Sequence, residues 1–142
     1  MKLSIIIPVF NEEKTIKQVL TSVASVKLSC TKEIIIVDDG STDKTVSGIK
    51  YQVLSMKNIK LIRHKTNLGK GAAIQTGIKH ATGDYILIQD ADLEYNPEEI
   101  PKLLAPVLIQ PATLIAVYGS RFANGRPVIP LLYYLGNIFL TK

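Results

Sequence analysis

Two short runs of adjacent β-branched residues constrain the fold of this chain most strongly. Ile5–Ile7 and Ile34–Ile36 are apolar at consecutive positions, so a strand formed by either run would bury both of its faces. Parallel strands that are covered by helices on both sides have this continuous apolar character, whereas half-exposed strands alternate apolar with polar residues. The sequence therefore favours a parallel sheet between layers of helices.

Segments with strand character and segments with helix character alternate along the chain. Strands are predicted at Leu3–Val9, Glu33–Val37, Ile59–Arg63, Tyr85–Gln89 and Leu114–Tyr118. Helices are predicted at about 12–26, from about 42 onward, at about 70–80 and at about 97–108. This order predicts an α/β fold with a mostly parallel sheet flanked by helices.

Three residues are expected to mark helix ends. Asn96 precedes Pro97 and two glutamates, which makes it a good N-cap for the helix that follows. Asn11 stands before two glutamates in the same way. Gly83 is expected to terminate the helix that precedes the fourth strand.

The composition fits one ordered domain. Of the 142 residues, 46% are hydrophobic, and the mean hydropathy of +0.20 excludes a disordered chain. The one cysteine, Cys30, permits neither an internal disulfide nor a cysteine-based zinc site, as expected in a reducing compartment. The formal net charge of +5 comes from scattered lysines without an aromatic platform, so solvated helix faces are expected and nucleic-acid binding is not.

A cluster of acids follows the predicted strand at Tyr85–Gln89. In an extended chain, side chains at i, i+2 and i+4 share one face, so Asp90, Asp92 and Glu94 are expected to gather at the carboxyl end of that strand. Ligands bind at this edge of an α/β sheet, and three adjacent carboxylates repel one another unless a cation lies between them. The cluster predicts a divalent-metal site that holds a phosphorylated ligand.

A second pair of acids, Asp38 and Asp39, ends the strand at Glu33–Val37. Adjacent strand residues point to opposite faces, so the two acids are expected to have different roles. One could accept hydrogen bonds from a base or ribose in a cleft, and the other could accept backbone N–H groups of the turn. The alternative is that both acids only cap the turn and the next helix.

A glycine-punctuated loop, residues 63–73, enters the third helix. It lacks the glycine and hydroxyl spacing of a P-loop and the third glycine of a dinucleotide-binding loop. It still offers a helix N-terminus and Lys70, which suit an anion, although tight helix–sheet packing would explain its glycines equally well. His64 and His80 are not expected to be catalytic.

The last part of the chain contains a candidate phosphate ligand and an apolar tail. Arg121 follows the last predicted strand, where an arginine can clamp phosphate oxygens, or it is an ordinary surface residue. The tail from Arg126 to Lys142 is too short and interrupted to span a bilayer. It suits either a membrane interface or packing on protein.

Five motifs in this order resemble family 2 glycosyltransferases, most closely the polyprenyl-phosphate branch of the dolichol-phosphate mannosyltransferase type. The motifs are Pro8–Glu13, Val37–Asp43, Asn67–Gly71, Asp90–Asp92 and Gly119–Phe122. The resemblance implies a GT-A fold, a nucleoside-diphosphate sugar as donor, a polyprenyl-phosphate lipid as acceptor and inversion at the anomeric carbon. It also implies a place at the cytoplasmic face of a membrane, with the membrane surface as a further partner.

The resemblance assigns roles to particular residues. It implies that Pro8, Phe10, Glu12, Val37 and Asp39 hold the nucleoside. Asp90 and Asp92, with Ala91 between them, would carry Mg²⁺ or Mn²⁺ and the diphosphate, and Glu94 would be a further metal ligand. Asp90, Asp92 and Arg121 are therefore the candidate catalytic residues, and Lys70 and Arg121 would help to neutralise the leaving group.

The expected domain organisation is a nucleotide-sugar-binding domain at 1–122, followed at 123–142 by the start of an acceptor-binding or membrane-proximal region. Catalytic domains of the resembled family continue past this point, so independent activity of the 142-residue chain is not assured by the sequence. Two alternatives stay open: a transferase of the polysaccharide-building kind with a hydroxyl acceptor, and a non-catalytic nucleotide-sugar-binding or regulatory domain.

Overall fold

The computed structural model describes residues 1–56, 58–109 and 117. The chain divides into two compact units, Met1–Leu104 and Ala105–Lys142, and the sheet and the site described below belong to the first. The predicted strand at 114–118, apart from Val117, and the predicted boundary after residue 122 lie outside the described residues.

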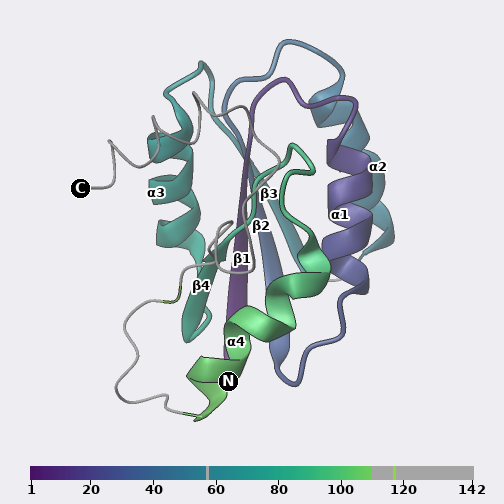
Figure 1. Ribbon diagram of the computed structural model, residues 1–142. Helices are drawn as coiled ribbons and strands as arrows, with labels where there is room; N and C mark the ends of the chain where they lie inside the picture. Colours follow the sequence, from purple (N-terminus) through teal and green to yellow (C-terminus); the bar gives the residue numbers. More distant parts are fainter. Residues whose placement is uncertain (57, 110–116, 118–142) are drawn as a thin grey trace, which may run out of the picture. The chain divides into compact units, whose positions relative to one another are not determined.

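Strands and helices alternate in the order that the sequence predicts (Figure 1). The strands are β1 (Lys2–Val9), β2 (Thr31–Asp38), β3 (Ile59–Arg63) and β4 (Tyr85–Ile88). The helices are α1 (Ile16–Ser25), α2 (Thr45–Ser55), α3 (Lys70–His80) and α4 (Ile100–Ile109), and the 3₁₀-helix η1 (Pro97–Glu99) leads directly into α4.

All pairings in the described sheet are parallel, and the strand order is β3-β2-β1-β4. In this register Val9 lies beside Asp38, and Asp38 lies beside Arg63. The carboxyl ends of the strands therefore meet at one edge, where the loops that follow β1, β2, β3 and β4 come together. The predicted α/β fold with a parallel sheet between helices is confirmed.

Helices cover both faces of the sheet, α1 and α2 on one side and α3 on the other (Figure 1). Ile5 and Ile7 pack in the core with α1, while Ile6 meets Gly77 of α3 from the opposite face. These three isoleucines are fully buried, and each contributes roughly 1.5–3 kcal/mol relative to an exposed side chain. This two-sided burial is the reason for the continuous apolar runs in the sequence.

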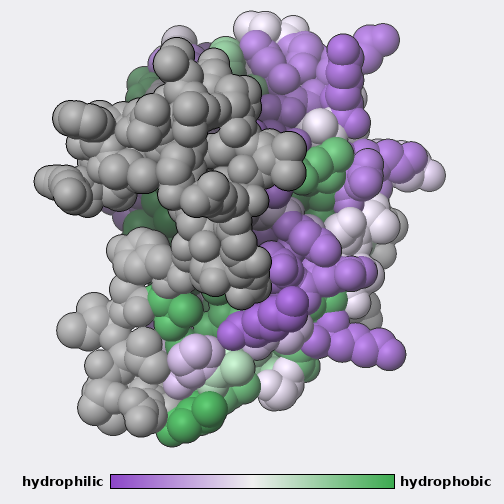
Figure 2. All heavy atoms as spheres, viewed as in Figure 1, coloured by the Kyte–Doolittle hydropathy of each residue, from purple (hydrophilic) through white to green (hydrophobic). Residues whose placement is uncertain are grey.

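The outer surface follows the same division between apolar and polar positions. Figure 2 shows hydrophilic side chains over the exposed side of α1 and α2, and hydrophobic side chains near the lower end of α4. Within residues 1–56 and 58–109, no helix combines the length and the apolar character that crossing a bilayer requires.

The predicted helix ends are partly correct. Asn96 is a cap as expected, since its side chain accepts a hydrogen bond from the Glu98 N–H at 3.0 Å. The expectation for Asn11 is wrong: α1 begins only at Ile16, and Asn11 adopts φ 55° so that its Oδ1 accepts the Thr42 N–H at 2.9 Å.

Gly83 is not the helix terminator that the sequence suggested. Helix α3 ends at His80, three residues earlier, and Ala81 is its C-cap. Gly83 instead lies against β1, where a Cβ atom would approach the Ser4 nitrogen to 2.7 Å. The glycine is therefore required by close approach between the loop and the strand.

Glu33 links three segments at the amino edge of the sheet. Its carboxylate accepts hydrogen bonds from Ser4 Oγ at 2.5 Å, from the Thr82 N–H at 2.7 Å and from Lys2 Nζ at 2.8 Å. Burial raises the pKa of Glu33, but these hydrogen bonds outweigh it and lower the pKa to about 2. The ionised side chain thus ties β2 to β1 and to the loop before β4.

Replacing Glu33 with glutamine should lower the free energy of unfolding by about 1–3 kcal/mol at pH 7. Because the pKa is depressed in the folded state, the stabilisation is present above the ordinary pKa of 4.5 and is lost as the pH falls toward about 2. Denaturant unfolding measured from pH 7 to pH 2 should show that the difference in free energy of unfolding between wild type and Glu33→Gln shrinks over that pH range. The matched control is Glu99→Gln, which removes an exposed surface pair and should cost less than about 1 kcal/mol; an equal loss in both variants would contradict the assignment.

Candidate functional site

A cavity of about 250 Å³ opens at the carboxyl edge of the sheet. It is formed by the end of β1 and by the loops after β1, β2, β3 and β4, together with the first turn of α3. The lining residues are Pro8, Val9, Phe10, Glu12, Asp39, Asn67, Lys70, Ala73, Asp90, Ala91 and Asp92. Pockets for complete small-molecule ligands usually measure about 300–1,000 Å³, so this cavity suits one part of a larger ligand.

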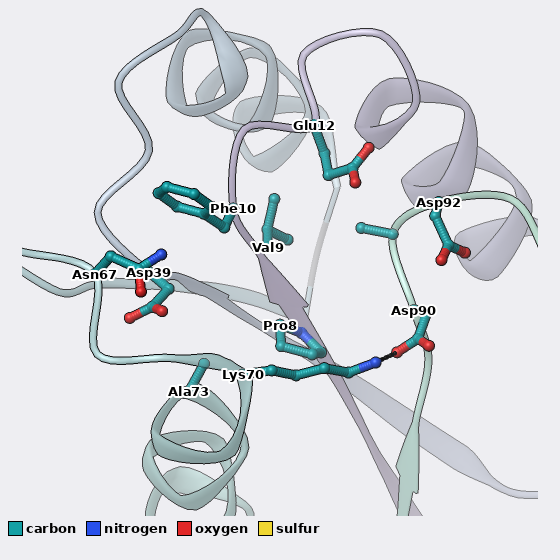
Figure 3. A pocket seen from close by; sticks show the side chains of 11 residues that line it. Pro8, Val9, Phe10, Glu12, Asp39, Asn67, Lys70, Ala73, Asp90 and Asp92 are labelled. Carbon is teal, nitrogen blue, oxygen red and sulfur yellow. Dashed lines mark ion pairs between the residues drawn. The ribbon is translucent and has the colours of Figure 1, made fainter.

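The polar residues of the cavity fall into two groups (Figure 3). Asp39 and Asn67 lie together at one end, beside the ring of Phe10. Lys70, Asp90 and Asp92 lie at the other end. The first group offers an aromatic face and hydrogen-bonding groups, whereas the second concentrates charge.

Asp38 and Asp39 have different roles, as the alternation along the strand predicts. Asp38 is fully buried, and its carboxylate accepts hydrogen bonds from Arg63 Nε at 3.1 Å and from the Ser41 N–H of the turn at 3.3 Å. Arg63 also donates to the Ser41 carbonyl. Asp38 therefore organises the turn, and Asp39 is the acid that lines the cavity.

Asp39 is bound tightly by the loop after β3. Its Oδ1 accepts from His64 Nδ1 at 2.7 Å and from the Leu68 N–H at 2.9 Å, and its Oδ2 accepts from the Gly69 N–H at 2.7 Å. Burial raises the pKa of Asp39, but the hydrogen bonds from His64, Leu68 and Gly69 lower it by more. The carboxylate is consequently ionised at neutral pH, although only 2% of the residue is exposed.

The loops after β1 and β2 are joined by a separate set of hydrogen bonds. The Glu12 N–H donates to the buried hydroxyl of Thr45 at 2.8 Å, and Glu13 accepts from the Lys44 N–H at 3.0 Å. Asp43 caps the turn by accepting the Thr45 N–H at 2.9 Å. These contacts fix the backbone beside Phe10 and Glu12 at the mouth of the cavity.

The expected alignment of three acids on one strand face is wrong. Strand β4 ends at Ile88, and the chain turns over the next residues, with Leu93 at φ 66° and Asp92 Oδ1 accepting the Glu94 N–H at 3.0 Å. Asp90 and Asp92 both line the cavity, but Glu94 does not. Within the part of the chain that the structure describes, no three acidic, histidine or cysteine side chains gather closely enough to hold a metal ion.

Lys70 faces Asp90 across the cavity, and their ion pair measures 2.7 Å between Nζ and Oδ1 (Figure 3). The lysine is the first residue of α3, directly after Gly69, whose φ of 91° lets the loop enter the helix. An ammonium group at a helix N-terminus favours an anion at this point, as the sequence suggested. In the described structure that anion is the carboxylate of Asp90.

Asp90 and Asp92 fit a hard divalent cation that arrives with its ligand. Mg²⁺ is usually held by one or two carboxylates together with substrate phosphates and water rather than by a complete protein cage. Carboxylate oxygens also suit Mn²⁺. The two aspartates on one cavity wall provide such a partial set of ligands. In the described structure the ammonium group of Lys70, rather than a metal ion, neutralises Asp90.

The cavity includes most of the residues that the sequence singled out for ligand binding. Of that set, Pro8, Phe10, Glu12, Asp39, Lys70, Asp90, Ala91 and Asp92 line it. Val37 is fully buried and packs with Ile35 and Ala73 instead, and Arg121 lies outside the described residues. Sequence reasoning missed Val9, Asn67 and Ala73 as lining residues, although each lies in a segment that the sequence had marked.

A protein-family model for glycosyl transferase family 2 matches residues 4–133 of the chain. Dolichol-phosphate mannosyltransferase of Pyrococcus furiosus is 38% identical over 129 residues, which is 90% of this chain and 35% of that protein. Undecaprenyl-phosphate 4-deoxy-4-formamido-L-arabinose transferase of Salmonella choleraesuis is 39% identical over 107 residues, which is 73% of this chain and 33% of that protein. The chain thus spans about a third of the length of these curated relatives.

Solved structures of two further proteins are similar as well. S. aureus TarS 1-349 in complex with UDP gives a TM-score of 0.70 at 32% identity, covering 92% of this chain and 38% of that one. Mannosyltransferase PcManGT of Pyrobaculum calidifontis, in complex with GDP-Man and Mn²⁺, gives 0.63 at 27% identity, covering 68% of this chain and 29% of that one.

Replacing Lys70 with methionine should raise the affinity of the cavity for a bare cation. The lysine side chain is 60% exposed, so losing the pair should change the free energy of unfolding by less than about 1 kcal/mol. Asp90 would then be available, and calorimetric titration should show Mn²⁺ binding roughly fivefold more tightly, equivalent to about 1 kcal/mol. Lys79→Met, at the far end of the same helix, is the control; equal affinities in all three proteins would refute the competition.

Proposed function

The chain belongs to glycosyl transferase family 2, and from that premise we propose that its first unit binds a nucleoside-diphosphate sugar together with Mg²⁺ or Mn²⁺. The fold agrees with the GT-A type that the sequence implied, a parallel sheet flanked by helices that matches solved glycosyltransferase structures. We further propose that the whole protein transfers the sugar to a polyprenyl phosphate with inversion at the anomeric carbon.

One observation supports donor binding above all others: a single cavity has an end with an aromatic ring and hydrogen-bonding groups, and a charged end. Phe10 and Asp39 can meet the face and the edge of a base, and Asn67 adds a further polar group beside them. Asp90, Asp92 and Lys70 lie where the diphosphate would follow. The complexes of related proteins with UDP and with GDP-Man and Mn²⁺ support the same reading.

The charged end of the cavity would supply the charge neutralisation that the reaction needs. Breaking a sugar–diphosphate bond leaves negative charge on the departing nucleoside diphosphate, and a divalent cation bound with the donor would stabilise that charge. Asp90 and Asp92 would hold the cation, and Lys70 would move from Asp90 to the diphosphate oxygens. The role expected of Arg121 in the same neutralisation remains a prediction.

The acceptor is proposed from the relatives. Both curated relatives reported above carry a polyprenyl phosphate in their names. A lipid phosphate is already an anion and needs no strong general base. An acceptor of this kind would place the protein at the cytoplasmic face of a membrane.

A transfer assay would test the acceptor directly. Purified protein, Mn²⁺ and a labelled nucleotide sugar would be supplied with either a polyprenyl phosphate in detergent or a soluble sugar acceptor. Transfer to the lipid phosphate is expected. Transfer to the sugar hydroxyl alone would favour the polysaccharide-building alternative, and donor binding without any transfer would favour the non-catalytic one.

Asp92→Ala should weaken Mn²⁺-dependent binding of UDP or GDP by at least tenfold, equivalent to about 1.4 kcal/mol or more. Asp92 is exposed on a turn, so the variant should keep the melting temperature of the wild type. Thermal shift with a panel of nucleotide sugars, with and without Mn²⁺, would identify the preferred donor before calorimetry. Glu98→Ala removes an equal charge from the exposed start of η1 and should bind as the wild type does; unchanged affinity in Asp92→Ala would overturn the metal assignment.

A further inference from the structure

His64 connects the cavity to helix α3 through two hydrogen bonds. Its Nδ1 lies 2.7 Å from Asp39 Oδ1, and its Nε2 lies 2.9 Å from Thr76 Oγ1. The side chains of His64 and Asp39 are only 10% and 3% exposed. Sequence reasoning assigned this histidine no function, because its neighbours along the chain are those of a polar loop.

The direction of each hydrogen bond follows from the ionisation of Asp39. An ionised carboxylate only accepts hydrogen bonds, so the Nδ1 of His64 must donate to it. In a neutral imidazole the other nitrogen is then the acceptor, and it receives the hydroxyl proton of Thr76. The Thr76 hydroxyl, which can donate or accept, accommodates the tautomer that Asp39 requires.

The hydrogen bonds at Asp39 leave few acceptor positions of its carboxylate available to a ligand. A carboxylate can accept about four hydrogen bonds. Among the described residues, Oδ1 accepts two and Oδ2 accepts one, the latter from Gly69. One lone pair of Oδ2 therefore remains for the cavity that Asp39 lines.

We propose that His64 is a positioning residue for the donor: its Nδ1–H fixes the carboxylate of Asp39 so that the remaining Oδ2 lone pair meets an N–H group on the edge of the base. The inference rests on the proposed donor binding and assigns a part of it to a residue that does not line the cavity. Thr76 supports the arrangement from α3, whose packing on the sheet makes it a rigid reference point.

The imidazole is distinct from the groups that hold the loop itself. The backbone N–H of His64 donates to the Asp38 carbonyl at 2.8 Å, and Arg63 is paired with the Asp38 side chain. The N–H groups of Leu68 and Gly69 bind Asp39 independently of the histidine. Removing the imidazole should therefore take away one of the three donors that orient the Asp39 carboxylate, while the main chain of the loop stays in place.

The test compares His64→Leu, His64→Asn and Thr76→Val with the wild type, by calorimetry in Mn²⁺. UDP and GDP report on the whole site, and inorganic pyrophosphate reports on the charged end alone. In His64→Leu, the nucleotide that binds the wild type should bind roughly tenfold to 100-fold more weakly, consistent with loss of a hydrogen bond to a charged group, while pyrophosphate affinity changes less than about twofold. The amide introduced by His64→Asn can donate from near the Nδ1 position, so this variant should recover most of the affinity, and Thr76→Val should lose several-fold.

His80→Leu is the matched control: His80 is an exposed histidine at the end of α3, and its removal should leave all affinities unchanged. Equal loss of nucleotide and pyrophosphate binding in His64→Leu would reduce His64 to a structural residue, and no loss of either would overturn the proposal. If the wild type bound neither UDP nor GDP, the proposed donor binding would fail by itself. ¹⁵N NMR of the histidine ring decides the arrangement separately: Nδ1–H for His64 is expected, and the Nε2–H tautomer would refute the positioning role whether or not a nucleotide binds.

Discussion

Two adjacent buried carboxylates at the end of β2 determine how the edge of the sheet is built. Asp38 and Asp39 are 0% and 2% exposed, and an ionised group buried without partners would cost several kcal/mol. The chain meets this requirement with Arg63 at the end of β3, and with His64 and two backbone N–H groups from the loop that follows. The position of the glycine-rich loop and the entry into α3 follow from that compensation.

The same compensation shapes the cavity. Because Asp39 holds the loop, Asn67 and Lys70 stand opposite the segment after β4, and Lys70 reaches Asp90. The end with Asp39 and Asn67 and the charged end are thus two consequences of one loop position. A site assembled from four strand ends in this way can bind a long, chemically divided ligand in a single orientation, as a nucleoside-diphosphate sugar would require.

Sequence reasoning was most successful where one local rule applied. Two-sided burial identified the parallel strands, and the cap at Asn96 followed from its neighbours. It failed where long-range contacts overrode the local preference: Asn11 bonds to the loop after β2 rather than capping α1, and Gly83 is set by the approach of β1. The acids after β4 were identified as site residues, but their extended geometry was wrong because the strand ends at Ile88 and the chain turns.

By itself, the sequence determined the layered α/β fold and the residue types that meet at the carboxyl edge, because apolar periodicity and ordered motifs are local properties of the chain. Only the tertiary structure decided which acid faces the cavity, that Lys70 neutralises Asp90, and that His64 forms a hydrogen bond with Asp39. These pairings join residues 20 to 25 positions apart. Their distances depend on strand register and loop closure, which no short segment of sequence specifies.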